Sequence, residues 1–378
     1  MSYFSTLNNL KSKEEDRVLN PVMSFDYAQQ LFEHHEQLSM VMDAIRHCQP
    51  LTRQINMELA AIEQFSKGGS CVGILDIISG GNIESFNKRI GISASDLFGR
   101  SESSKRDIYV SSLTEDVTNF IGNLWNAVRN AIQKVYDWGT NITNGEGRVM
   151  MAKGQIDNAI NALNAKGNAS ITCDMTDPAD WLAKASECLK LYQVLIEILT
   201  TSGQSITSGQ LTENSLQDQL LGKMQRASIV NIKLNIQDGH KSSSFMFPGI
   251  CSGRIELNDT AQTLSECKQM LEQIIGKINE LNQALAAYAQ NITTAQTQYK
   301  CNTDCAAVVS NISSATQMVT KTIVSVNSYV VETISGGLID IGGKIVGAIG
   351  PVPQQQAPVE QTPAPTQQPQ DNQPQQGQ

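Results

Sequence analysis

The stretch that decides the fold is LNDTAQTLSECKQMLEQIIGKINELNQALAAYAQNI, residues 257–292. Apolar residues recur there every seven positions, in two series that are offset by three. This spacing is the a/d seam of a helix that packs along another helix over about five heptads. The positions that form this helix-packing seam are Leu257, Leu264, Leu271, Ile274, Ile278, Leu281, Leu285 and Ile292. The pattern leaves open whether the partner helix belongs to the same chain.

A second long helix is expected near residues 178–200. Asp177 supplies an N-cap side chain, and Pro178 suits the first helical position. Trp181 begins an apolar stripe with helical spacing. This helix is the intramolecular partner that we favour for the helix-packing seam, in an antiparallel coiled-coil-like pair.

Between these two helices the hydrophobic period changes from that of a helix to that of a strand. Apolar and polar residues alternate over 230–237, and Asp238-Gly239 is a turn signal. Phe245-Met246-Phe247 then offers a return strand. We therefore predict a β-hairpin at about 228–247, inserted between two long helices.

The N-terminal part is predicted to hold two helical regions joined by a linker. Residues 1–65 form an N-terminal helical region that Pro50 interrupts. Residues 66–115 lose the helical period and fill with Gly and Ser, which indicates a linker with little structure. Asp116 then opens a tryptophan-containing amphipathic helix, and the helical domain runs over 116–318. That helix either faces the core or docks on a membrane surface, and its few positive charges favour the core.

The C-terminal part divides into an apolar segment and a tail. Residues 319–350 are apolar and Gly-rich, but Glu332, Asp340 and Lys344 interrupt them. No uncharged run reaches the ~20 residues of a membrane-spanning helix, so the segment is either a final bundle helix or a point of membrane contact. Residues 351–378 contain seven of the 11 prolines, which predicts a disordered Pro/Gln-rich tail.

Composition disfavours several classes of protein. The 378 residues carry a formal net charge of -9, with 17% charged and 5% aromatic residues. A nucleic-acid binder needs a concentrated basic patch, so direct contact with DNA is doubtful. A hydrophobic content of 40% is enough to bury a core. The first residues lack an apolar secretory segment, so the cysteines are expected to be reduced thiols.

The spacing of an active site is not found in the sequence. His34-His35 is expected to be surface or satisfied in the fold rather than a metal site. Cys301 and Cys305 share a helix face, but no second Cys or His pair completes a zinc set. A nucleotide-binding glycine loop and a nucleophile elbow are also missing. We therefore predict no catalytic residues, no enzyme activity, no cofactor and no metal.

Together these segments predict a mainly α fold: an elongated helical bundle with an antiparallel coiled-coil-like helix pair, an inserted β-hairpin and a disordered tail. Their order resembles that of the internal head proteins of large tailed bacteriophages, which are packaged inside the capsid with the genome. The resemblance implies a structural protein of the virion, located in the capsid interior and in the host cytoplasm during assembly. It implies capsid or prohead core proteins as partners. The segments that carry it are 31–65, 68–113, 116–138, 155–292 and 351–378.

The resemblance also implies proteolytic maturation by a prohead protease, which cuts after a Glu two residues beyond a small or aliphatic side chain. Ala61-Ile62-Glu63 and Leu113-Thr114-Glu115 match this pattern. A cut needs locally unfolded backbone, which favours Glu63 at the end of the first helical region and Glu115 at the end of the linker. Residues 1–65 would then be a propeptide or core-targeting segment.

Two other functions stay open. One is an α-helical membrane-active or pore-forming protein, because long helices flank a hydrophobic hairpin and residues 319–350 offer a second apolar segment. The other is a coiled-coil scaffold protein that uses the helix-packing seam to bind another chain.

Overall fold

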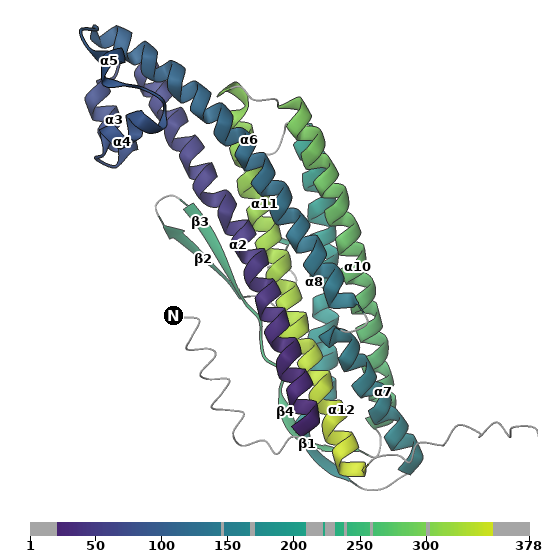
Figure 1. Cartoon of the computed structure of the whole chain (residues 1–378). Helices are drawn as coiled ribbons and strands as arrows, with labels where there is room; N and C mark the ends of the chain where they lie inside the picture. The colour runs from purple at the N-terminus through teal and green to yellow at the C-terminus, as the bar shows by residue number, and fades with distance from the viewer. Residues whose placement is uncertain are drawn as a thin grey trace, which may run out of the picture.

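The protein folds into an elongated bundle of long α-helices with a small helical head at one end (Figure 1). This computed structural model describes residues 21–144, 147–166, 171–208, 222–223, 231–237, 240–257, 260–299 and 303–350. The prediction of a mainly α, elongated bundle with an inserted hairpin is confirmed. The tail predicted at 351–378 lies outside the described residues.

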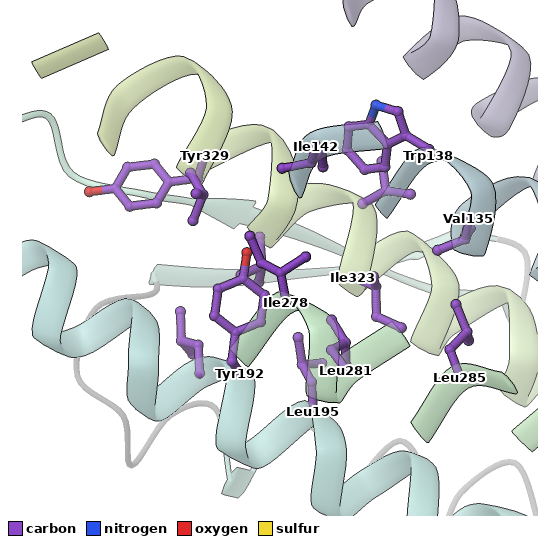
Figure 2. Close-up of a cluster of buried hydrophobic side chains, with 14 of the residues drawn as sticks. Val135, Trp138, Ile142, Tyr192, Leu195, Ile278, Leu281, Leu285, Ile323 and Tyr329 are labelled. Carbon is purple, nitrogen blue, oxygen red and sulfur yellow. The ribbon is translucent and has the colours of Figure 1, made fainter. Parts of the chain in front are cut away.

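The bundle has one continuous apolar core. Its helices are α2 (Pro21–Ser66), α6 (Glu102–Thr143), α7 (Arg148–Lys166), α8 (Pro178–Thr207), α10 (Thr260–Gln298), α11 (Thr303–Tyr329) and α12 (Ser335–Ile349). A π-helical turn, η1 (Val330–Ile334), joins α11 to α12. Apolar side chains from α6, α8, α10 and α11 converge between the helices, among them Trp138, Tyr192, Leu281 and Ile323 (Figure 2). Burial of these stripes is the main stabilising contribution to the bundle.

The helix-packing seam is buried, and α8 of the same chain is its main partner. Three contacts join residues of α10 to residues of α8: Cys267 with Pro178, Lys277 with Gln193, and Asn291 with Gly203. Residue numbers rise together in these contacts, so α8 and α10 run parallel. The antiparallel direction predicted for this pair is wrong. The antiparallel neighbours of α10 are α6, where Gly139 lies against Asn282 and Thr143 bonds to Asn279, and α7. In α7, Lys153 pairs with Glu272 and Asp157 with Lys268.

A small sheet explains the parallel direction. β1 (Thr172–Thr176) pairs antiparallel with β4 (Ser252–Glu256). α8 follows β1 and α10 follows β4, so both helices leave from the same end of the bundle. The Leu257 N–H donates to the Ile171 carbonyl at 2.9 Å, which extends this pairing beyond the strands. The five-residue strands are too short to give a clear period in the sequence.

α2 is one helix of 46 residues, so the break predicted at Pro50 is wrong. Proline in a helix interior costs about 3 kcal/mol, because it lacks an N–H and its ring crowds the preceding turn. Here Pro50 is exposed, and the faces on both sides of it are buried, with Ile45 and Ile55 fully covered. Burial of these flanking residues offsets the local cost.

α2 also packs into the bundle rather than standing apart from it. It runs antiparallel to α11, where Thr52 Oγ1 lies 3.0 Å from Ser313 Oγ and the Ser310 hydroxyl donates to Asn56 Oδ1 at 2.8 Å. Val41 belongs to the same core cluster as α6, α8 and α10. Removing the residues up to 65 would therefore uncover the core.

The linker predicted over 66–115 is a helical head instead. It contains α3 (Cys71–Ser79), α4 (Ile83–Arg89) and α5 (Ala94–Leu97), and α6 already begins at Glu102. Phe65, Phe86, Tyr109 and Leu113 form part of its own apolar cluster. Some Gly and Ser residues of this segment cap helices: Gly80 ends α3 at φ 63°, and Ser101 accepts from the N–H of Ser104 at the start of α6.

Candidate functional site

The β-hairpin lies in the connection between α8 and α10. β2 (Asn231–Gln237) pairs with β3 (His240–Met246) in an antiparallel register that sets Ile232 opposite Phe245. The hairpin predicted at about 228–247 is confirmed over these two strands, and its turn lies outside the described residues. The strands stand beside the bundle in Figure 1, and among the described residues their principal contacts are with each other.

The five residues after the hairpin, Phe247–Cys251, hold it to the bundle, and we call them the strap. At the start of the strap, the ring of Phe247 stacks on Tyr329 with 4.6 Å between the ring centroids. The Tyr329 hydroxyl donates to the Pro248 carbonyl at 3.0 Å. Burial raises the pKa of Tyr329, so the hydroxyl stays protonated and able to donate.

The other end of the strap is bound to the N-terminus of α8. The Cys251 N–H donates to Asp180 Oδ2 at 2.8 Å, and the Cys251 carbonyl accepts from the Asp177 N–H at 2.9 Å. The first of these bonds holds the pKa of Asp180 below its usual range. The Asp180 carboxylate in turn raises the pKa of the exposed Cys251 thiol. The strap is thus fixed at both ends by a few polar and aromatic contacts.

The strap contacts Tyr329, which directly precedes the π-helical turn between α11 and α12. Tyr329 directly precedes η1, and the Trp181 indole donates to the Ile334 carbonyl at its end at 2.7 Å. The Ser335 hydroxyl donates to the Val330 carbonyl at 3.0 Å, across the widened turn. Single π-turns inside α-helices occur frequently at functional sites. This one joins the strap to the C-terminal helix.

The predicted Gly-rich apolar segment, 319–350, packs inside the bundle. Gly337 lets Trp181 approach, since a Cβ there would lie 2.9 Å from the indole. Gly342 lies against the backbone of Gln155, where a Cβ would be 2.7 Å from the carbonyl oxygen. In the part of the chain that the structure describes, no helix has the length and apolar content that a membrane crossing requires. The close approach at Gly337 and Gly342 and the burial of Leu338, Ile341 and Ile345 show that this segment packs against neighbouring helices.

A histidine cluster lies on the other side of η1, where α2 meets it. His34 is 7% exposed, and its Nε2 is 3.6 Å from Oε1 of Glu332. Its ring centroid is 5.5 Å from Trp138 and 5.6 Å from His35. Buried Arg148 acts electrostatically on His35 and Glu332. We call these five residues the histidine cluster.

Two groups of the histidine cluster have shifted pKa values. Burial lowers the pKa of His35, an effect that Glu332 opposes and that His34 and Arg148 reinforce. Burial alone would raise the pKa of Glu332, but contact with His34 and the nearby charges of His35 and Arg148 hold it below its usual value. Glu332 is therefore ionised at neutral pH, while the imidazole of His35 is neutral.

A second ionic cluster joins α2 to the head. Arg89 Nη2 lies 2.7 Å from Oε1 of fully buried Glu58, and the same guanidinium pairs with Asp116. The Gln54 amide donates to Glu58 Oε1 at 2.6 Å. Burial raises the pKa of Glu58 to about 7, against the opposing effects of Gln54 and Arg89. We call Glu58, Arg89 and Asp116 the head cluster.

The two predicted processing positions lie in helices. Glu63 is exposed near the end of α2 and pairs with Lys67 at 2.5 Å. Glu115 is also exposed, but it lies in the interior of α6 rather than at the end of a linker. A protease would have to unfold a 42-residue helix locally to cut there, so the accessibility argument for Glu115 fails.

The helix-packing seam, by contrast, lies where it was predicted. All eight of its residues are buried: Leu257, Leu264, Leu271, Ile274, Ile278, Leu281, Leu285 and Ile292. They are covered by helices of the same chain, so the seam leaves no free face for a second chain. The seam therefore offers no exposed surface for the scaffold function, in which it would bind another chain.

Potential metal ligands do not gather in the described residues, where no group of three or more His, Cys, Asp or Glu side chains could hold an ion. Cys301 lies outside those residues. Burial raises the pKa of Cys267 to about 12 and also raises that of Cys188. Both thiols thus remain protonated and fill the core.

Sequence reasoning missed the strap and the two ionic clusters. His34-His35 was expected at the surface or satisfied, yet His34 is buried with its Nε2 3.6 Å from Glu332 Oε1, and His35 Nδ1 is buried without a hydrogen-bond partner. A histidine pair on the apolar side of a helix is the one local signal of this arrangement. Its partner Glu332 comes from a distant part of the chain, which no periodicity connects to α2.

No protein-family model matches the chain, and neither does any curated protein or solved structure. The contacts described above therefore carry the functional argument.

Proposed function

We propose that this is an α-helical membrane-active protein that presents its β-hairpin to a lipid bilayer. The observation that carries the proposal is the attachment of the hairpin: β2 and β3 contact chiefly each other, and the strap ties them to the bundle at two points. Releasing the strap breaks two contacts at Tyr329 and two hydrogen bonds at the start of α8, and it withdraws Phe247 and Ile250 from the apolar core. The helix-packing seam stays intact, so the bundle can survive release.

The hairpin has the sequence of an element that needs a further apolar surface. Its register pairs Ile232 with Phe245, and Leu234 and Ile236 follow at alternate positions, opposite Ser243 and Lys241. An isolated two-stranded hairpin is marginally stable in water. Contact with a bilayer would supply the missing surface for the apolar positions.

The size of the hairpin limits how far it enters. Each strand has seven residues, whereas a strand that crosses a bilayer needs about 9–11. The edges of a two-stranded hairpin also carry backbone groups that hydrocarbon leaves unsatisfied. The hairpin therefore enters the interfacial region of one leaflet, and crossing would require pairing with hairpins of other copies.

A reversible lock on the strap tests the proposal. Asp180→Cys places a thiol beside native Cys251, because the Asp180 carboxylate contacts that residue in the folded protein. The probe is dye release from phosphatidylcholine vesicles, with and without an anionic lipid. Oxidised Asp180→Cys protein should release little dye, and reduction should restore release to the level of the unlocked protein.

Matched variants keep this test interpretable. Asp180→Ser removes the acceptor without a lock and should increase release. Ile232→Asn with Leu234→Asn should abolish it, whereas Asn235→Gln at an alternating position should not. Absence of dye release by the unlocked, folded protein on every vesicle would refute the proposal.

The internal head protein of a bacteriophage is the second candidate. The observation in its favour is the order of elements, with Trp125 and Trp138 in α6 and a hairpin between α8 and α10. Packing of α2 in the core speaks against removal of residues 1–65. Mass spectrometry of purified virions tests this candidate: it requires the protein inside filled heads, and processing requires peptides that begin at Gln64 or Asp116.

A further inference from the structure

The exposed large apolar side chains of the molecule gather on the head. Among the described residues there are four of them, and three belong to α3 or directly follow α5: Val72, 69% exposed, Ile77, 77%, and Phe98, 89%. The fourth, Met40, lies on α2. We call Val72, Ile77 and Phe98 the head face. Scattered exposed apolar residues are common on monomers, whereas three in one small unit indicate a contact surface.

α3 is apolar on its outer side as well as its inner side. The inner side is buried through Cys71 and Leu75 in the apolar cluster of the head, so α3 is anchored without its outer side. The outer side carries two residues of the head face, and Asp76 is the one charged residue of the helix. A Cβ added at Gly73 would meet no atom within 4 Å, so no described residue covers the helix there.

Phe98 and Val72 flank the junction where α3 meets α6. The Cys71 N–H, next to Val72, donates at 2.9 Å to Oε1 of Glu102, which lies four residues after Phe98. This bond brings the two exposed apolar side chains to one part of the head.

Basic side chains surround this junction. The Arg106 guanidinium donates at 3.3 Å to a backbone carbonyl in the turn before α3. Lys105 and Arg106 act electrostatically on Cys71, and exposed Arg100 lies between α5 and α6. The acid at the junction, Glu102, already accepts the Cys71 N–H. The cations therefore remain to attract an external negative charge.

The head also differs in charge from the rest of the molecule. Residues 67–107 contain six basic and five acidic residues, whereas the whole chain has a net charge of -9. The excess of acidic residues therefore lies outside the head. Exposed apolar side chains with basic neighbours suit a partner that presents negative charge at the edge of an apolar layer.

We propose that the head face is a docking surface for an anionic phospholipid bilayer, whose interfacial region receives its three apolar side chains. Covering all three would bury roughly 500 Å², less than the ~800 Å² per partner of a stable protein interface. A bilayer surrounds each inserted side chain and needs no matching apolar face, so it fits this surface better than a second copy does.

The choice of a bilayer rests on the proposed function, to which this inference adds a second contact. Head and hairpin project from the same side of the bundle in Figure 1, so one bilayer can face both. Docking through the head leaves the strap in place. Binding is therefore expected without release of the hairpin.

The locked protein tests this independence. Oxidised Asp180→Cys should sediment with phosphatidylcholine vesicles that contain phosphatidylserine, although it releases little dye. Adding Val72→Ser, Ile77→Ser and Phe98→Ser should weaken this binding by about tenfold or more, since these apolar groups would no longer leave water. Met40→Ser, exposed outside the head, is the matched control and should bind normally. Unchanged binding by the triple variant, with its fold verified by circular dichroism, would overturn the proposal.

Fluorescence reports whether Phe98 enters the bilayer. The native side chains Trp125, Trp138 and Trp181 are at most 2% exposed, so their emission should not respond to vesicles. Emission from Phe98→Trp should shift to shorter wavelength on the same vesicles, and that from Met40→Trp should not. The absence of a shift in Phe98→Trp would contradict docking through the head face.

Charge variants test the lipid class. Arg100→Gln with Lys105→Gln should weaken binding and reduce its dependence on salt, whereas Asp76→Asn should strengthen it. Equal binding to vesicles of phosphatidylcholine alone would refute an anionic partner. Self-association without lipid that the triple variant abolishes, combined with no vesicle binding, would assign the head face to a second copy and overturn the proposal.

Two outcomes distinguish this inference from the proposed function. Head-dependent binding without dye release by the unlocked protein would retain docking and refute membrane activity of the hairpin. Dye release that is undiminished in the triple variant, with no binding by the locked protein, would retain that activity and refute docking.

Discussion

The two ionic clusters on α2 are expected to respond to acid in opposite directions. At the head, burial raises the pKa of Glu58 to about 7, so the folded state favours the neutral carboxyl. At η1, burial lowers the pKa of His35, and contact with His34 and the nearby charges of His35 and Arg148 lower that of Glu332. The folded state there favours a neutral His35 and an ionised Glu332. Acidification is therefore expected to increase the contribution of the head cluster to folding stability and to decrease that of the histidine cluster.

Linkage gives the sign of each contribution. A folded pKa that is raised, as for Glu58, contributes stability that is present below about pH 4.5 and is lost as pH rises through about 7. A lowered histidine pKa, as for His35, contributes stability that is lost as pH falls below about 6.5. The lowered pKa of Glu332 adds a further loss in stronger acid. α2 is thus expected to loosen first at η1 and to stay attached at the head.

The largest expected effect comes from disrupting the helix-packing seam, which lies in the bundle to which both ends of α2 are attached. Leu271→Asn and Ile278→Asn place unpaired amides in the helix-packing seam, at a cost of about 4 kcal/mol each. Because the seam pairs in cis, the double variant should unfold the monomer, as measured by circular dichroism during chemical denaturation. Gln273→Asn, exposed on the same helix, is the control. A folded double variant that only changes its sedimentation would contradict pairing in cis.

The next effect should be confined to the head. Arg89→Ala leaves the buried Glu58 carboxylate without its closest cation, which costs about 3 kcal/mol when the carboxylate is charged. The loss should shrink toward pH 5, because Glu58 then becomes neutral. Chemical denaturation at several pH values measures this trend. Arg46→Ala removes an exposed pair with Asp43 and should change little. A cost that grows on acidification would contradict the raised pKa of Glu58.

The packing of α12 against α7 gives a smaller effect. Gly342→Ala drives a methyl group into the Gln155 backbone and should cost about 1–3 kcal/mol. Gly343→Ala meets open space and should stabilise α12 by up to about 1 kcal/mol, through helix propensity. Thermal unfolding of the two variants measures the difference. Equal melting temperatures would show that α7 and α12 are not tightly packed at Gly342.

The fold was predictable where the signal is local and repeated. The heptads over 257–292 and the two-residue period over 230–237 each come from one continuous stretch, so the seam and the hairpin could be predicted. The direction of α8 relative to α10 could not, because the short β1–β4 pairing that fixes it has no clear period.

The head and the candidate site escaped prediction for other physical reasons. Gly and Ser indicate both loose linkers and the caps between short helices, and only tertiary burial of residues such as Phe86 decides between them. The contacts of the strap with Tyr329, and of His34 with Glu332, join distant segments. Neither contact leaves a pattern in the residues around it.

The smallest predicted effect tests the opposite signs directly. Glu58→Gln keeps an amide near Arg89 but removes the group that titrates. In the unmodified protein the Glu58 contribution to stability falls as pH rises from about 4.5 through about 7, so this part of the pH dependence should vanish in the variant. The loss of stability in acid that comes from His35 is then no longer offset by Glu58. Stability should therefore fall more steeply with decreasing pH in the variant than in the unmodified protein. Denaturation midpoints measured across this range, with Glu63→Gln as an exposed control on the same helix, give the comparison. If the denaturation midpoint fell less steeply on acidification in Glu58→Gln than in the unmodified protein, the head cluster, and not the histidine cluster, would be the one that weakens in acid.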